Sequence, residues 1–309
     1  MSQVPVFPLL KLPYLCIEAV VLNLCCHDIV IFSFISKRTY RLVKTFKSPV
    51  TSMSLYLEEK ICLDMEPIAK WKADCRDEEL FENIDYYSSL FKCSVDYLKI
   101  DGDYLPEDNI NFSFNKLKTL IISGKEEISN DKLKYLLENF EVTDSLEINI
   151  PVSNTFSCDP KLFKAKVLEV MGPNSAGWIT GDFFSQIPLD SIHRLVFERS
   201  QITIEDVVAV ITKWFCSGEE CVLKGLAVVF DDVIEPVDWA GKRFKTMPFD
   251  PERRPKAIIN TRGNEIDFSN GLDIVRSDGQ LATIYVERNH LIFHIWSETE
   301  RRGLPTIVD

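Results

Sequence analysis

The sequence of 309 residues lacks the features that mark several whole classes of protein. Twelve glycines, fifteen prolines and nine cysteines, in a chain with 46% hydrophobic residues, exclude collagen-like, disordered and disulfide-framework proteins. The most apolar stretch, residues 12–35, is interrupted by Glu18, His27 and Asp28. It therefore falls short of the run of about 18 apolar residues that a bilayer-spanning helix needs, and we expect no membrane segment. The chain is long enough to bury a sizeable core.

Targeting signals are also missing from the sequence. No positively charged region precedes the first apolar residues, and Lys11 and Glu18 break the apolar stretch, so no signal peptide is expected. The nine cysteines are an odd and scattered set, which predicts reduced thiols and a cytoplasmic and/or nuclear location.

Motifs for catalysis are the third absence. The sequence contains no G-x-S-x-G, no G-x-x-x-x-G-K-[ST] and no H-E-x-x-H. His290 and His294 lie on one side of a predicted strand, and Cys25, Cys26 and His27 follow one another, but no C-x-x-C pair supports a zinc site. Structural histidines and buried thiols are favoured, and we expect a protein without catalytic activity, metal or cofactor.

Charge is present but unevenly distributed. Residues 1–50 carry six Lys/Arg and two Asp/Glu, a net of +4, whereas the remainder carries 29 basic and 45 acidic residues, a net of −16. The total of −12 argues against a general nucleic-acid binder, which needs a basic surface to replace phosphate counterions. The asymmetry indicates either an N-terminal module with its own partner or a solvated basic face of one helix.

The N-terminal module is expected to contain three short helices. Ile17, Val20, Val21 and Leu24 have helical spacing after Pro13. Asp28 is the expected N-cap of a second helix, and Ser36 that of a third helix with a basic outer face. So small a unit cannot bury all of its apolar side chains, which predicts a protein–protein surface.

These residues resemble the F-box family. The pattern runs without a gap from Leu12-Pro13 to Lys37-Arg38, with Thr39 where the family usually has an aromatic residue. Phe7 to Lys11 and Ser36 to Thr39 resemble the nematode branch. The resemblance implies binding to the Skp-type adaptor of cullin–RING ubiquitin ligases. The implied contacts are Leu12, Pro13, Ile17, Val20, Leu24, Ile29, Ile35 and Arg38.

After residue 50 the pattern becomes strand-like and then repetitive. Residues 53–57 and 61–63 are expected to form a hairpin. From residue 95 a short unit recurs around leucines 98, 120, 146, 168, 195 and 226, spaced 22 to 31 residues apart. This is close to the period of about 20–29 residues in leucine-rich repeats. Helices are expected at 133–140 and after the capping motif Thr203-Ile204-Glu205-Asp206. A plain α/β fold with coincidental spacing is the alternative.

The C-terminal half carries a second resemblance. Six segments of this half resemble the nematode F-box-associated domain of the second type. They are residues 178–182, 202–206, 212–214, 223–228, 273–284 and 293–296. Asp278-Gly279 indicates a type I′ hairpin turn, within a predicted β-meander of 272–276, 281–287 and 291–297. We predict an α+β chain with an F-box at 1–49, an irregular leucine-rich-repeat-like α/β solenoid at 50–255 and an antiparallel β-meander cap at 256–309.

One basic segment stands out in the acidic part of the chain. Residues 242–262 have a net charge of +5 and three prolines, which predicts a long loop. We expect Lys242, Arg243, Lys245, Arg253, Arg254 and Lys256 to contact an acidic or phosphorylated partner. A solvated linker is the alternative.

Together these patterns predict a non-catalytic subunit of a Skp–cullin–F-box ubiquitin ligase that recruits an unknown protein substrate. No nucleic acid or membrane is expected as a partner. The alternative is a repeat-type interaction scaffold that acts outside any ligase.

Overall fold

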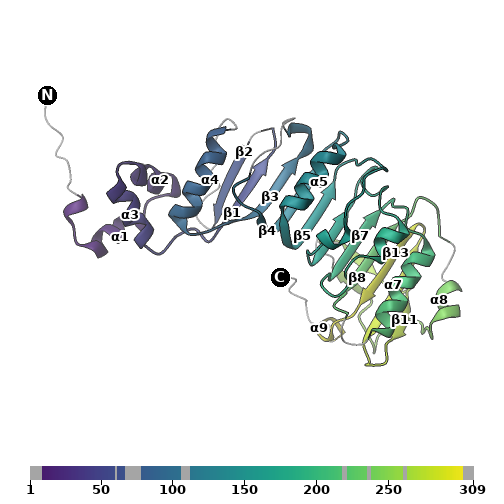
Figure 1. Ribbon diagram of the computed structural model, residues 1–309. Coiled ribbons are helices and arrows are strands. Elements are labelled where there is room, and N and C mark those ends of the chain that lie inside the picture. The colour runs from purple at the N-terminus through teal and green to yellow at the C-terminus, as the bar shows by residue number, and fades with distance from the viewer. Residues whose placement is uncertain are drawn as a thin grey trace. The chain divides into compact units, whose positions relative to one another are not determined.

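The computed structural model describes residues 9–59, 61–66, 78–105, 112–217, 221–234, 238–259 and 263–301 (Figure 1). The chain divides into two compact units, Met1–Leu117 and Lys118–Asp309, which we call unit 1 and unit 2. Phe7, which belongs to the first resemblance, and Arg262, which belongs to the basic segment, lie outside the described residues. The boundary predicted after residue 49 stays a prediction. Among the described helices, none combines the length and the apolar character that crossing a membrane requires.

Unit 1 begins with the three expected helices and continues into a small sheet. Its elements are η1 (Leu9–Lys11), α1 (Tyr14–Leu22), α2 (Cys26–Phe34), α3 (Lys37–Thr45), β1 (Ser52–Leu57), β2 (Ile61–Glu66), α4 (Glu78–Phe91), β3 (Val95–Asp101) and η2 (Gly102–Tyr104). The predicted hairpin is confirmed, because β1 pairs antiparallel with β2. On its other side β1 pairs parallel with β3.

The helix caps of unit 1 confirm one prediction and correct another. Ser36 caps α3, and its hydroxyl accepts a hydrogen bond from Thr39 N (3.2 Å) while Thr39 Oγ1 accepts one from Ser36 N (2.9 Å). The two bonds form a reciprocal capping box. Thr39, which stands where the family of the first resemblance usually has an aromatic residue, is therefore part of this cap. The prediction that Asp28 caps α2 is wrong, because α2 begins earlier and Cys25 Sγ accepts the bond from Asp28 N at 3.4 Å.

Unit 2 is a mixed α/β unit built on one large sheet. Its elements are β4 (Lys116–Ser123), α5 (Asn130–Asn139), β5 (Glu141–Asn149), η3 (Pro160–Leu162), β6 (Val167–Val170), α6 (Gly181–Ser185), β7 (Arg194–Glu198), α7 (Ile204–Cys216), β8 (Gly225–Val229), α8 (Asp238–Arg243), β9 (Ala257–Ile259), β10 (Glu265–Asp267), β11 (Leu272–Val275), β12 (Leu281–Glu287), β13 (His290–Ile295) and α9 (Glu298–Arg301). The strand order is β11-β12-β13-β8-β7-β6-β5-β4, and β9 and β10 form a separate pair.

The anchor leucines explain why β5 to β8 are parallel. Leu146, Leu168, Leu195 and Leu226 are register partners on neighbouring strands, and each is at most 3% exposed. A parallel strand needs a crossover before its neighbour, and the spacing of the leucines leaves room for one. In Figure 1, α5 and α7 lie across the near side of these strands. Trp214 of α7 packs on Phe293 with ring centroids 5.1 Å apart, on the leucine side of the sheet. The mostly parallel sheet is therefore confirmed.

The predicted β-meander is also confirmed, with one change at its turn. Strands β11, β12 and β13 pair antiparallel in sequence, and β13 continues antiparallel onto β8. The type I′ prediction at Asp278-Gly279 is wrong. Gly279 N donates to Arg276 O at 2.9 Å, and only Gly279 has a positive φ (88°) in this turn. This matches a three-residue loop in which a residue in the left-handed region follows a tight turn.

Candidate functional site

Exposed apolar side chains are concentrated on the first two helices. Of the ten large hydrophobic residues that are exposed in the described part of the chain, six belong to a single stretch of 22 residues. They are Tyr14 (45%), Leu15 (73%), Val20 (43%), Ile31 (50%), Phe34 (57%) and Ile35 (68%), and we call them the N-terminal apolar surface. Clustered apolar exposure of this kind marks a surface that binds another protein.

The sequence of α1 and α2 explains why they expose these residues. Both helices are apolar around most of their circumference, so each buries one side and leaves apolar residues on the other. Ile17 and Val21 of α1 and Ile29 and Val30 of α2 form the inner side, none more than 5% exposed. The outer side is then available to a partner.

The structure divides the eight predicted adaptor contacts into two groups. Pro13, Val20, Ile35 and Arg38 are exposed, and Leu12 and Leu24 are half-buried. Direct contact by Ile17 and Ile29 is contradicted, because these side chains are 5% and 1% exposed and support the helices from inside. The spacing of apolar residues in the sequence could not distinguish the inner side of each helix from its outer side. Sequence reasoning missed four exposed apolar residues, Tyr14, Leu15, Ile31 and Phe34. For the last three, the only signal was that they lie opposite the predicted stripe.

A basic surface accompanies the apolar one. Lys37, Arg38 and Arg41 of α3 are exposed, and Arg38 Nη2 donates to the carbonyl oxygen of Leu10 at 3.4 Å. Positive charges beside an apolar surface favour encounter with an acidic partner and fix its orientation.

Helix α4 packs against these helices within unit 1. Ser33 Oγ and the Tyr86 hydroxyl lie 2.6 Å apart, and the Tyr40 hydroxyl and Ser89 Oγ lie 2.9 Å apart. The rings of Phe34 and Tyr86 are stacked, with centroids 4.6 Å apart. Helices α2 and α3 are thereby joined to α4 by paired hydroxyls and an aromatic stack.

One group of side chains has the residue types of a metal site. The ligand atoms of Cys25, His27 and Asp28 lie within 4.8 Å of one another, and all three residues are exposed. They stand at the amino end of α2, where the helix dipole opposes a cation, and we assign no metal to them. The expectation of buried thiols holds for Cys26, where burial, followed by the charge of Cys25, raises the pKa, and it is wrong for Cys25.

The histidine pair of β13 has separate roles. His294 is 15% exposed at its side chain and its Nε2 lies 3.4 Å from Glu300 Oε1, whereas His290 is exposed. Four residues along a strand span about 13 Å, so the two rings cannot share one ion.

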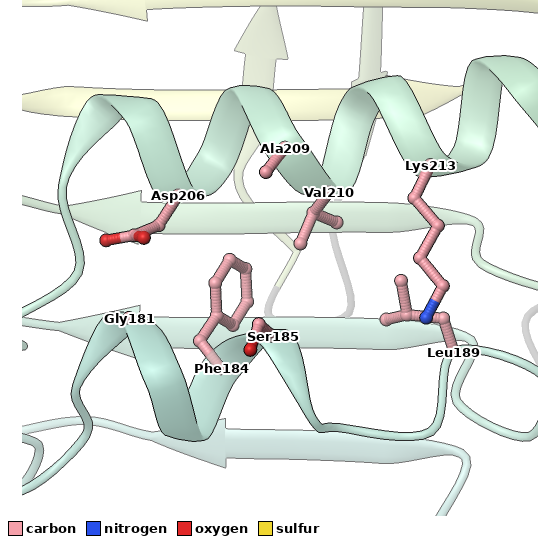
Figure 2. A pocket seen from close by; sticks show the side chains of 8 residues that line it. All are labelled: Gly181, Phe184, Ser185, Leu189, Asp206, Ala209, Val210 and Lys213. Atoms are coloured by element: carbon pink, nitrogen blue, oxygen red, sulfur yellow. The ribbon is translucent and has the colours of Figure 1, made fainter.

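A small groove lies between α6 and α7 (Figure 2). Its volume is about 90 Å³, and Phe184 and Val210 form part of its apolar lining, with Asp206 and Lys213 towards opposite ends. Asp206 Oδ2 already accepts hydrogen bonds from Thr203 N (2.8 Å) and Thr203 Oγ1 (2.7 Å). The carboxylate therefore completes the predicted capping box of α7, and the groove is a packing feature at that cap.

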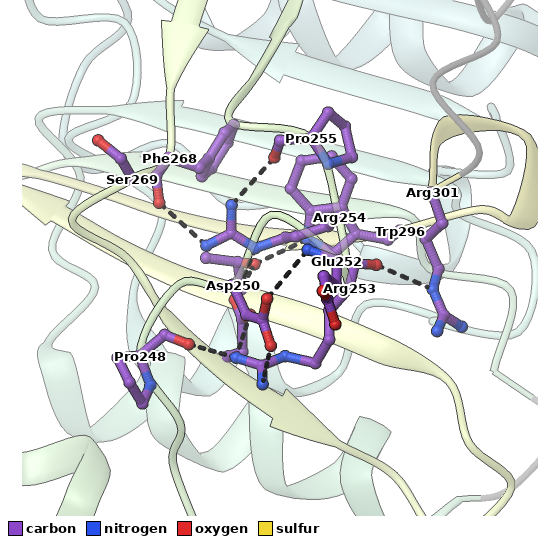
Figure 3. Close-up of polar contacts among 12 residues, drawn as sticks. Pro248, Asp250, Glu252, Arg253, Arg254, Pro255, Phe268, Ser269, Trp296 and Arg301 are labelled. Atoms are coloured by element: carbon purple, nitrogen blue, oxygen red, sulfur yellow. Dashed lines mark hydrogen bonds and ion pairs between the residues drawn. The ribbon is translucent and has the colours of Figure 1, made fainter.

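The basic segment differs most from its prediction (Figure 3). Arg254 was expected on the surface, but it is 1% exposed and its Nε donates to Asp273 Oδ1 at 2.7 Å. Its Nη2 donates to Phe268 O at 3.0 Å. The guanidinium lies over the rings of Phe249 (4.7 Å) and Trp296 (5.2 Å). The prediction that Arg254 contacts a partner is therefore wrong, because every face of its guanidinium is used inside unit 2.

The other basic residues of this segment fall into two groups. Arg253 donates to Asp250 Oδ2 (3.1 Å) and to the carbonyl oxygen of Pro248, and Lys256 pairs with Asp267 at 2.8 Å. Lys242, Arg243 and Lys245 are exposed. The expectation of one long loop is also corrected, since Lys242 and Arg243 end α8 and residues 257–259 form β9.

Comparison with known proteins identifies the N-terminal helices. Residues 9–51 match the family model of the F-box domain. No curated protein and no solved structure matches the chain. The F-box domain supports a Skp-binding adaptor of Skp–cullin–F-box ligases in general, and such proteins are generally non-catalytic subunits.

Proposed function

We propose that this chain recruits a protein substrate to a Skp–cullin–F-box ubiquitin ligase. The F-box at residues 9–51 binds the Skp-type adaptor, and unit 2 binds the substrate. The chain performs no chemistry and raises the local concentration of a substrate lysine near the conjugating enzyme. The scattered cysteines support action in the cytoplasm and/or the nucleus.

The observation that carries the adaptor part is the coincidence of two independent findings. The residues that match the F-box family include all six members of the N-terminal apolar surface. Burial of a leucine-sized side chain contributes about 1.5–3 kcal/mol, so the three leucine-sized members of this surface, Leu15, Ile31 and Ile35, are able to supply a substantial part of a stable interface.

For unit 2 we propose an irregular leucine-rich-repeat-like domain of the nematode F-box-associated type. The in-register leucines of β5 to β8 and the antiparallel β11 to β13 support this proposal. We further propose that the exposed Lys242, Arg243 and Lys245 contact an acidic or phosphorylated stretch of the substrate. Reversing the charges of Lys242 and Arg243 is expected to weaken that contact, and unchanged substrate binding would refute it.

Binding to purified Skp-type adaptor tests the proposed function. Leu15→Glu combined with Ile31→Glu places two charges in the apolar interface, and we expect the adaptor to be lost in size-exclusion chromatography and at least a hundredfold weaker Kd by calorimetry. Val233→Glu is the matched control, because Val233 is 76% exposed in unit 2. Adaptor binding that survives the double substitution in a folded chain would contradict the proposal.

The alternative is an interaction scaffold that acts outside any ligase. It is favoured by the same repeat pattern but not by the F-box match. If wild-type chain fails to bind the adaptor while unit 2 still binds a protein partner, the scaffold function replaces the ligase function.

A further inference from the structure

Three basic side chains stand at equivalent positions along one edge of the sheet in unit 2. Lys166, His193 and Lys224 directly precede the parallel strands β6, β7 and β8, which are neighbours in the sheet. The backbone places the three residues in the same way. The carbonyl oxygen of Lys166 accepts a hydrogen bond from His193 N (2.7 Å), and that of His193 accepts one from Lys224 N (2.6 Å). We call these three residues the basic edge.

The side chains of the basic edge lie close to one another and to solvent. Adjacent strands are about 4.8 Å apart, so the backbones of Lys166 and Lys224 lie about 10 Å apart, with His193 between them. Burial, and then the charges of Lys224 and Lys166, lower the pKa of His193, so both ammonium groups act on the ring. The two lysines are exposed and His193 is partly buried. A ligand can therefore reach all three.

Most of the hydrogen-bonding capacity of the basic edge is unused within the chain. In the part of the chain that the structure describes, the side chains of His193 and Lys224 make no hydrogen bond and no ion pair. Lys166 Nζ donates to Asp144 Oδ1 at 2.8 Å. That pair is exposed, and it uses one of the three donors of the ammonium group. At least two donors of Lys166 therefore stay available, together with all those of the other two side chains.

These donors match a phosphate monoester. Such a group carries a charge of about −1.5 to −2 at pH 7 and three strong acceptor oxygens. Two ammonium groups balance that charge, and the imidazole N–H supplies a third donor. A carboxylate has a single charge and two oxygens, so it leaves part of the basic edge unsatisfied. The chain after residue 50 has a net charge of −16, which makes this edge a local exception in an acidic region.

We propose that the basic edge binds a phosphorylated serine or threonine of the substrate protein. The phosphoryl oxygens accept hydrogen bonds from Lys224 Nζ, from a ring nitrogen of His193 and from a free donor of Lys166 Nζ. The proposal rests on the proposed function, because it names the class of residue that unit 2 recognises in its substrate. It uses other residues than the contact proposed near α8.

The ionisation of His193 reports this binding in the wild-type chain. A phosphate dianion beside the imidazole favours its charged form, so a bound phosphopeptide should raise the pKa of His193. The probes are nonapeptides with a central phosphoserine, aspartate or serine and uncharged, degenerate flanks. Because the chain has four histidines, His193→Gln assigns the resonance in an NMR titration. We expect the pKa to rise with the phosphoserine peptide and to stay unchanged with the serine peptide.

Fluorescence anisotropy with labelled forms of the same peptides measures the affinity. We expect the phosphoserine peptide to bind about tenfold more tightly than the aspartate peptide. Lys224→Gln removes one exposed cation of the basic edge and should weaken the phosphoserine peptide about tenfold. Lys134→Gln on α5 is the matched control, because it removes the same charge at a side chain that is 52% exposed. It should change the affinity less than about threefold.

Three results would overturn the proposal. An unchanged pKa of His193 at high phosphoserine peptide would show that the phosphate does not bind beside the ring. Equal weakening by Lys224→Gln and Lys134→Gln would mean attraction without a site. Displacement of the peptide by an equal concentration of inorganic phosphate would make the basic edge a site for free phosphate. Lys224→Gln should leave adaptor binding unchanged, so failure of the basic edge and failure of the F-box are distinguishable.

Discussion

Replacing Arg254 by methionine removes a guanidinium from the interior of unit 2 and leaves a carboxylate behind. The side chains of Arg254 and Asp273 are both 0% exposed, and the Nε–Oδ1 distance is 2.7 Å. In the variant, Asp273 keeps the Thr283 hydroxyl at 2.8 Å and the more distant Arg253 Nη2 at 3.4 Å. Breaking a buried pair in this way costs about 3–5 kcal/mol, because the carboxylate stays buried and only the longer ion pair to Arg253 compensates its charge.

That cost is large compared with the stability of a domain, which is about 5–15 kcal/mol. With a denaturation slope near 2–3 kcal/mol per M urea, the midpoint of unit 2 should fall by about 1–2 M. The measurement is urea denaturation followed by tryptophan fluorescence, to which Trp296 contributes because it lies over the guanidinium.

A double substitution separates the pair from simple loss of packing. Arg254→Met with Asp273→Leu removes both charges, so it should recover part of the loss. Lys256→Met is the control, because Lys256 and Asp267 form an exposed pair, and it should leave the midpoint unchanged. If Arg254→Met shifts stability by less than about 1 kcal/mol, or if the two single effects simply add in the double variant, the reasoning about this pair is wrong.

Two further predictions concern the caps of unit 2. A Cβ on Gly181 would overlap the Asp206 carboxylate, so Gly181→Ala should disrupt the cap of α7 and lower the thermal midpoint. Gly225→Ala should be tolerated, because its Cβ would meet only Phe293 O, at 3.5 Å. Equal midpoints of the two variants would contradict this. Burial opposes ionisation of Glu300, but hydrogen bonds from His294 and Ser297 outweigh it and lower its pKa to about 2. Because the pKa of Glu300 in the folded chain lies below its usual value, the anchoring of α9 should persist above about pH 4.5 and be lost as the pH falls towards 2. The measurement is an NMR titration of this carboxyl, and a pKa near the ordinary value would refute the assignment.

The parts of the fold that the sequence predicted depend on short-range patterns. Thr203 and Asp206 cap α7 because the two side chains need only three residues of separation. Leu168 and Leu195 recur because parallel strands repeat one register after each crossover. Such signals lie within a few residues or repeat at regular intervals, so they can be found without coordinates.

The basic segment could not be predicted for a different reason. The partner of Arg254 is 19 residues away in the sequence and lies in β11, so a count of charges cannot show that the guanidinium is buried. The same applies to the second resemblance. Asp273, Arg276 and Trp296, which are among the residues that carry it, are at most 4% exposed. Their shared pattern is explained by the interior of unit 2 and does not locate a binding surface.

The first two helices show a third kind of limit. A helix that is apolar on all sides has no polar face to orient it, so spacing alone assigned Ile17 and Val20 to the same side. The structure separates them, because Ile17 is 5% exposed and Val20 is 43% exposed.

The contacts between α4 and the N-terminal helices determine where the F-box can be cut for transplantation. A fragment that ends at residue 49 would lose Tyr86, which stacks on Phe34 and shares a hydrogen bond with the buried Ser33. Its solubility would suffer from the newly exposed ring and hydroxyl. A fragment that ends at Leu117 keeps these contacts. Chimeras that graft this F-box onto another substrate-binding protein should therefore be joined after unit 1.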